Sequence, residues 1–136
     1  MNTKHNFLLA LIASALLVVA AGSALAHHSF AAFDMANQKS ITGTVNKVQW
    51  TNPHIWIWID VANDKGGSDT YGFEGMSPNY LERRGWTRTT LKTGDKLTVS
   101  FRPMKDGSHG GMFINGKMST GKVLTMGGAG DGEPEK

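Results

Sequence analysis

Cysteine is absent from this chain of 136 residues, and its absence excludes several kinds of chemistry. No disulfide can cross-link the fold, and neither a thiolate metal site nor a thiol nucleophile can be formed. A small domain without cysteine must be stabilised by the burial of apolar side chains. We therefore expect a single core built from the aliphatic and aromatic residues of the chain.

Catalytic motifs and clustered positive charge are also missing. The sequence contains no HExxH, GxSxG or P-loop pattern, so it gives no sign of a metalloprotease, serine hydrolase or nucleotide-binding site. Lysine and arginine are scattered, and Arg83 and Arg84 form the only adjacent pair, whereas proteins that follow a nucleic-acid backbone cluster these residues. We expect a non-enzymatic protein that does not bind nucleic acid.

A secretory signal peptide is predicted at the N-terminus. Residues 7–21 form an apolar run that is short for a membrane span, and a short positively charged start precedes it. Ala24 and Ala26 then provide the small side chains of a signal peptidase site. We expect cleavage of residues 1–26, a mature start at His27 and a periplasmic or secreted protein without a membrane anchor. An uncleaved anchor is the alternative, although no stop-transfer pattern follows.

The mature chain has room for one domain. Loss of Lys4 with the signal leaves 13 of the 14 basic residues against 11 acidic ones, a net charge of only +2. We place a single domain at residues 27–126. Residues 127–136, GGAGDGEPEK, have too little apolar surface to offset their ordering entropy, and we expect a disordered tail there.

Short runs of alternating apolar residues between Gly, Asn, Asp and Pro predict a mainly β domain. The first run, residues 40–50, should contain a bulge or bend near Gly43 or Asn46. The second, residues 54–62, is apolar on both faces and should be a central strand. The other expected strands are DTYGFEG, KLTVSFRP, GMFING and GKVLTM.

One helix is predicted in SPNYLERRG, after the third strand. Ser77 is a suitable N-cap, Pro78 suits the first helical position, and Gly85 is a natural stop. The order of three strands, a helix and further strands is that of a small five- to six-stranded OB-fold-like barrel, with the helix between strands 3 and 4. A small β-sandwich is the alternative, because residues 112–114 add an extra strand.

Four stretches together resemble an uncharacterised family of small exported bacterial proteins, a domain of unknown function. They are HHSFAAFD, GTVNKVQWTNPHIWIWIDV, the FEG after the third strand and LERRGWTRTTLKTGD. The combination of HHSF with WTNPH carries most of the resemblance, which extends to about Leu124. It implies an exported single-domain protein and brings no activity.

Copper binding is one functional hypothesis. After cleavage, His27 would offer its α-amine and its ring Nδ1 to one ion, and an all-nitrogen set suits Cu(II). His54 or His109 would supply a third nitrogen, and His28 is the adjacent candidate. The alternative is that these histidines are solvated or hydrogen-bonded residues with no metal role.

A ligand-binding aromatic face is the second hypothesis. Trp56 and Trp58 lie two residues apart on one side of a strand and could contact a sugar, an aromatic metabolite or a peptide, with Glu74 as a polar group nearby. Alternatively, the predicted helix or the N-terminal segment covers both indoles. An acid/base pair of His54 and Glu74, or a surface for another exported protein, also remains open.

Overall fold

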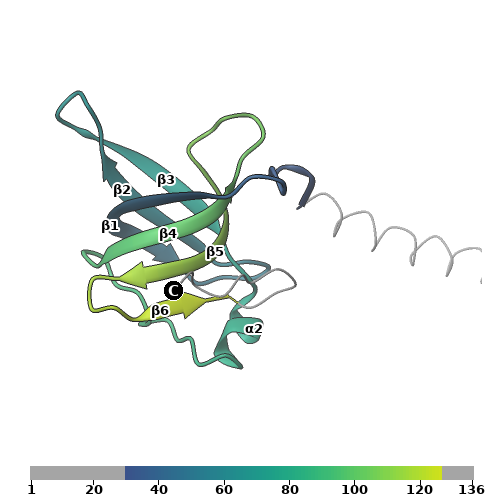
Figure 1. Cartoon of the computed structure of the whole chain (residues 1–136). Helices are drawn as coiled ribbons and strands as arrows, with labels where there is room; N and C mark the ends of the chain where they lie inside the picture. The colour runs from purple at the N-terminus through teal and green to yellow at the C-terminus, as the bar shows by residue number, and fades with distance from the viewer. Residues whose placement is uncertain (1–29, 127–136) are drawn as a thin grey trace, which may run out of the picture. The chain divides into compact units, whose positions relative to one another are not determined.

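In the computed structural model, which describes residues 30–126, the strands curl into a barrel (Figure 1). Its elements are β1 (Lys39–Gln49), β2 (Trp56–Ala62), β3 (Ser68–Glu74), α2 (Pro78–Glu82), β4 (Lys96–Pro103), β5 (Gly110–Met118) and β6 (Val123–Thr125). The predicted signal peptide, the mature start and the tail lie outside the described residues. Within residues 30–126, no helix is long and apolar enough to span a membrane.

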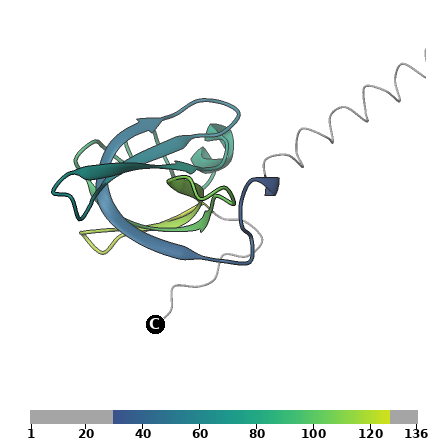
Figure 2. The same ribbon diagram turned by 90° about the horizontal axis from the view of Figure 1, so that it is seen from above.

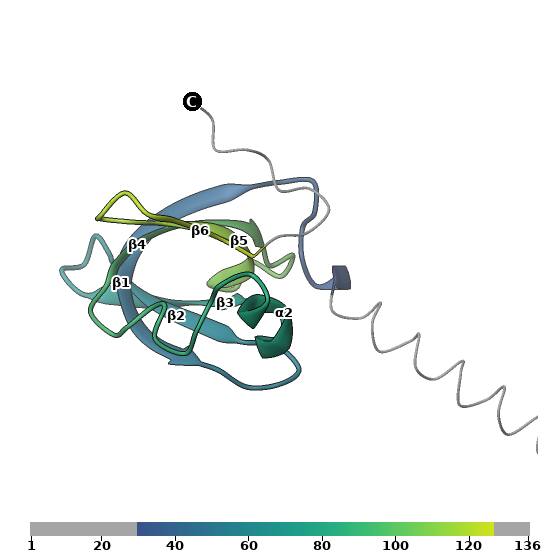
Figure 3. The same ribbon diagram turned by 90° about the horizontal axis from the view of Figure 1, so that it is seen from below.

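The sheet closes on itself. Its strand order is β3-β2-β1-β4-β5-β6 with antiparallel neighbours, and a parallel pairing of β3 with β5 completes a ring of five strands. Seen from below, the strands surround a common centre, with β6 extending the sheet beyond β5 (Figure 3). The mainly β, OB-fold-like barrel with a helix between strands 3 and 4 is therefore confirmed, and the sandwich alternative is wrong because β5 joins β3.

A bulge in β1 lets this long strand serve two partners. The register with β2 shifts between Val45 and Lys47, which leaves Asn46 as the extra residue. Residues 44–49 pair with β2, whereas residues 39–44 pair with β4. The bulge bends the strand around the barrel, as the curved ribbon in Figure 2 shows. One of the two predicted positions for the bend is thus confirmed.

The core is formed by the inward-facing side chains of the alternating strands. Among the hydrophobic residues of the range 30–126, those with no exposed surface are Ile55, Ile57, Ile59, Phe73, Leu81, Leu97 and Val99. Most of them come from β2, β3 and β4, where every second residue points inward.

The helix α2 lies at one end of the barrel (Figures 1 and 3). The Ser77 hydroxyl accepts a hydrogen bond from the Tyr80 amide, Pro78 occupies the first turn, and Gly85 after the helix has φ +81°. Leu81 is fully buried, so the helix contributes directly to the core. The predicted N-cap, first-turn proline and glycine stop are confirmed.

Glycines allow β3 and β5 to approach each other. A Cβ atom at Gly110 would lie 1.9 Å from the carbonyl oxygen of Gly72, and Gly110 has φ +138°. At Gly111, a Cβ atom would lie 1.9 Å from the carbonyl oxygen of Arg102 on β4. Both approaches are far inside van der Waals contact, so only glycine fits at these two positions. The predicted strand GMFING begins at Gly111, whereas β5 begins one residue earlier at Gly110 and continues to Met118.

Candidate ligand-binding face

The alternation of β2 places two tryptophans on the outside of the barrel. Ile57 and Ile59 point inward and are completely buried, so Trp56 and Trp58 point outward. Both indoles are half-buried and lie outside the set of side chains that forms the core. We call Trp56 and Trp58 the tryptophan face.

The two indoles are organised relative to one another. Their ring centroids are 5.9 Å apart and their planes meet at 21°, so the rings are nearly parallel. The Lys47 Nζ lies 5.2 Å from the Trp58 ring centroid, within the range of a cation–π interaction. Lys47 is the partner of Trp58 in the β1–β2 register, so the ammonium group reaches the ring from the neighbouring strand.

A glycine on β3 makes room for these rings. Gly72 pairs with Trp58, and a Cβ atom at this position would lie 3.0 Å from the indole nitrogen of Trp58 and 3.7 Å from Trp56. Both indoles therefore lean across the backbone of β3. A larger residue at this position would displace Trp58.

A histidine–carboxylate pair lies next to the tryptophan face. His54 precedes Trp56 by two residues, and Glu74 is the cross-strand partner of Trp56. The imidazole Nδ1 of His54 donates a hydrogen bond to the Glu74 carboxylate. Their side chains are 34% and 17% exposed, so the pair is accessible from the surface. The acid/base pairing that the sequence left open is thus present as a contact.

The backbone around this pair explains its position. The pairing of β2 and β3 continues beyond both strands, because the Ile55 amide donates to the Met76 carbonyl and the Gly75 amide donates to the Ile55 carbonyl. The alternation of side chains therefore extends back to His54, which shares the outer surface with the two tryptophans.

Two side chains of the segments expected to cover the tryptophans, Leu81 and Phe33, are themselves buried. Leu81 of the helix is fully buried in the core, and Tyr80 packs against the same core and under the Arg84 guanidinium, 3.7 Å from the ring centroid. Phe33 is 3% exposed and pairs with Met104. Phe30 remains 55% exposed.

His109 lies in a different environment from His54. Its imidazole stacks on the Tyr71 ring with a centroid distance of 4.5 Å and an interplanar angle of 5°. Tyr71 and Glu74 are three residues apart on β3 and point to opposite sides of the strand. The two histidines therefore contact opposite sides of β3.

The described residues contain no group of three histidine, aspartate or glutamate side chains that could hold a metal ion. His27 and His28 lie outside the described residues, so their relation to His54 and His109 stays a prediction. The hydrogen bond from His54 Nδ1 to Glu74 leaves Nε2 as the nitrogen with a lone pair, which is a common arrangement for metal-binding histidines.

A polar network adjoins the tryptophan face at the far end of β2. The Asp60 carboxylate accepts hydrogen bonds from the Thr70 hydroxyl at 2.7 Å and from the Asn46 side-chain amide at 2.7 Å. These two bonds, with that from Thr70 the stronger influence, lower the pKa of Asp60 below its ordinary value. The network connects β1, β2 and β3 around the bulge.

Lys47 and Gly72 also contribute to the site, although the sequence pattern does not single them out. Each is brought into place by strand register rather than by proximity in the chain. The signal in the sequence is the small residue between Tyr71 and Phe73, because glycine within a strand often marks a close approach by another group.

Comparison with known proteins identifies the family of this chain. The chain belongs to the family of unknown function DUF6152. The match extends over residues 14–114 and so includes all of the tryptophan face and the His54–Glu74 pair. It confirms the resemblance to an uncharacterised domain. No curated protein and no solved structure matches the chain. Membership of the family assigns no activity, so function has to be argued from the site.

Proposed function

We propose that this protein is an exported, non-enzymatic binding protein whose ligand contacts the tryptophan face. The observation that carries the proposal is the pair of half-buried, nearly parallel indoles outside the core, beside the accessible His54–Glu74 pair. Half-buried indoles still offer some apolar surface to a sugar ring or an aromatic group, while an imidazole and a carboxylate offer hydrogen bonds. OB-fold barrels use the corresponding surface of strands 2 and 3 for ligands.

The ligand class that fits is a neutral sugar or an aromatic acid of similar size. Isothermal titration calorimetry with a panel of both classes, using the wild-type protein and the variants Trp56→Ala and Trp58→Ala, tests the proposal. We expect at least one ligand to bind and each variant to weaken that binding about tenfold or more, since aromatic contacts dominate such sites.

Met35→Ala is the matched control, because Met35 is an exposed apolar residue that belongs to neither β2 nor β3. This variant should bind like the wild type. Binding that survives both tryptophan substitutions unchanged, or the absence of any binding across the panel, would contradict the proposal.

Copper is the second candidate ligand, favoured by the orientation of His54. The hydrogen bond to Glu74 holds its ring with Nε2 available, and the free amine and Nδ1 of a processed His27 would supply two further nitrogens. Titration with Cu(II) of the protein beginning at His27, of a form with one extra alanine before it, and of His54→Ala tests this. We expect tight Cu(II) binding by the protein that begins at His27, and loss of that binding in the form with the extra alanine and in His54→Ala. Equal, weak binding by all three would rule the site out.

Export is part of the same proposal. The supporting observation is the apolar run and Ala24–Ala26 pattern before His27. Mass spectrometry of the protein recovered from the periplasm or the medium should give an N-terminus at His27. Recovery only from the cytoplasm with the N-terminal 26 residues attached would contradict it.

A further inference from the structure

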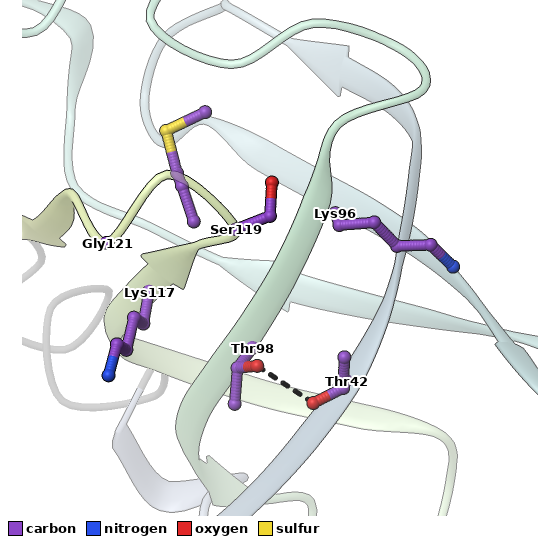
Figure 4. A pocket seen from close by; sticks show the side chains of 7 residues that line it. Thr42, Lys96, Thr98, Lys117, Ser119 and Gly121 are labelled. Carbon is purple, nitrogen blue, oxygen red and sulfur yellow. Dashed lines mark hydrogen bonds between the residues drawn. The ribbon is translucent and has the colours of Figure 1, made fainter.

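A hollow on the outer surface of the barrel, separate from the tryptophan face, has the composition of an anion site. It has a volume of roughly 350 Å³ and lies over β1, β4 and the end of β5 (Figure 4). Its lining residues are Thr42, Lys96, Thr98, Lys117, Met118, Ser119 and Gly121. Two of these side chains are cationic, three carry hydroxyls, and none is acidic.

Strand register explains why these residues converge. Thr42 pairs with Thr98, and Thr98 pairs with Lys117, so one row of outward side chains crosses three strands. The turn after β5 closes one side, where the Ser119 amide donates to the Lys96 carbonyl at 3.3 Å. Both lysines border the hollow, and Figure 4 shows their chains extending to opposite sides of it.

The hydroxyl groups that line the hollow can still donate a hydrogen bond to a ligand. The Oγ1 atoms of Thr42 and Thr98 lie 2.8 Å apart and share one hydrogen bond (Figure 4). Two hydroxyls have two protons, and only one is used between them, so the other can be donated outward. Ser119 adds a third hydroxyl at the turn.

Positive charge at the hollow is not neutralised locally. Among residues 30–126, neither Lys96 nor Lys117 forms an ion pair. Asp95, the acid next to Lys96 in the chain, has its carboxylate directed to the Lys92 amide, 2.8 Å away. A surface with two unpaired ammonium groups and no lining carboxylate attracts anions and disfavours metal cations.

We infer that this hollow binds a small oxyanion of the phosphate type, either free or as the headgroup of a phospholipid. Ammonium and hydroxyl groups are the donors that hold phosphate oxygens, and the volume accommodates a phosphate or a small phosphomonoester. The site shares no residue with the tryptophan face, so this inference does not depend on the proposed function.

The test is a titration of the ¹⁵N-labelled protein with inorganic phosphate at constant ionic strength, set by sodium chloride. We expect saturable amide shifts at Thr98, Lys117 and Gly121. The double variant Lys96→Gln/Lys117→Gln should bind phosphate about five- to tenfold more weakly, as expected for two partly solvated charge contacts. Thr98→Val, which retains the charges and the β-branched shape, should also weaken binding.

The matched control is Lys65→Gln/Lys105→Gln, which removes the same charge from two exposed lysines in other loops. It should bind phosphate like the wild type. A second arm measures co-sedimentation with vesicles of phosphatidylglycerol and of phosphatidylcholine. Binding only to phosphatidylglycerol, lost in Lys96→Gln/Lys117→Gln, identifies a lipid headgroup as the source of the phosphate. Equal weakening by both double variants, or no binding in either arm, would overturn the inference.

Discussion

At the scale of the residue, the contact of His54 with Glu74 orients the imidazole ring. Its Nδ1 donates to the Glu74 carboxylate, so the neutral ring should carry its proton on Nδ1 and present Nε2 as an acceptor. Both binding hypotheses use this arrangement, one for a ligand hydroxyl and the other for a metal ion. The site therefore depends on Glu74 as a positioning residue.

The first prediction concerns that tautomer. In Glu74→Ala, His54 loses its acceptor, and the neutral ring should move toward the Nε2–H form that prevails in water. Long-range ¹H–¹⁵N correlation spectra of the imidazole report the tautomer directly. His109, which stacks on Tyr71, is the internal reference and should not change. A wild-type His54 already protonated at Nε2 would contradict the prediction.

The second prediction concerns Asp60, whose pKa is lowered chiefly by the Thr70 hydroxyl and then by Asn46. A lowered pKa means that this carboxylate stabilises the fold above the pKa of the unfolded chain, and that the contribution is lost as the pH falls through the folded value. Thr70→Val should raise the pKa of Asp60 toward its ordinary value, measured by ¹³C titration of the carboxyl group. Thr44→Val, at the cross-strand partner of Asp60, is the control. An equal rise in both variants would contradict a specific role for Thr70.

At the scale of the element, β2 and β3 together form the candidate site, and their predictability differs. The alternation of β2 predicted that Trp56 and Trp58 share one face, opposite Ile57 and Ile59, because strand periodicity depends only on local sequence. The sequence could not show that β3 places Gly72 beneath them and Glu74 beside His54. Those contacts depend on the register between β2 and β3, which pairs residues from two separate strands.

The third prediction tests the role of Gly72. In Gly72→Ala, the new methyl group would lie 3.0 Å from the Trp58 indole nitrogen, so the ring must move. We expect the indole N–H resonance of Trp58 to shift, with a loss of stability of about 1–2 kcal/mol, as for a modest steric insertion.

Gly67→Ala in the β2–β3 loop is the control, because its Cβ would have only distant neighbours, the nearest at 3.6 Å. It should leave the Trp58 resonance in place. A Gly72→Ala spectrum in which Trp58 is unchanged would show that the indoles do not lean across β3.

At the scale of the whole molecule, the sequence predicts a barrel but not the strand pairing that closes it. The order of strands and helix indicated an OB-fold-like barrel, and the cap residues Ser77 and Gly85 fixed the helix between β3 and β4. The parallel junction of β3 and β5 could not be predicted, since glycines in β5 resemble turn residues in sequence. In the structure they are the positions where two backbones meet.

The fourth prediction follows from that junction. Gly110→Ala would place a methyl group 1.9 Å from the Gly72 carbonyl oxygen and would also strain a backbone with φ +138°. We expect it to lower the free energy of unfolding by more than about 3 kcal/mol, because closure itself is disrupted. Urea denaturation measures the change. Gly67→Ala should cost less than about 0.5 kcal/mol. Similar stability for both variants would contradict the role of Gly110 in closure.

The central claim is that a ligand binds at the tryptophan face, and the four tryptophans provide a direct test within one spectrum. The measurement follows the indole N–H resonances of the ¹⁵N-labelled processed protein as the sugars and aromatic acids are added. Trp86, a buried core residue whose indole donates to the Thr125 carbonyl, is the internal reference. Our account predicts saturable shifts of the Trp56 and Trp58 resonances while that of Trp86 stays fixed. The account would be contradicted by a ligand that binds without shifting the Trp56 and Trp58 resonances. It would also be contradicted if no sugar or aromatic acid shifted either resonance.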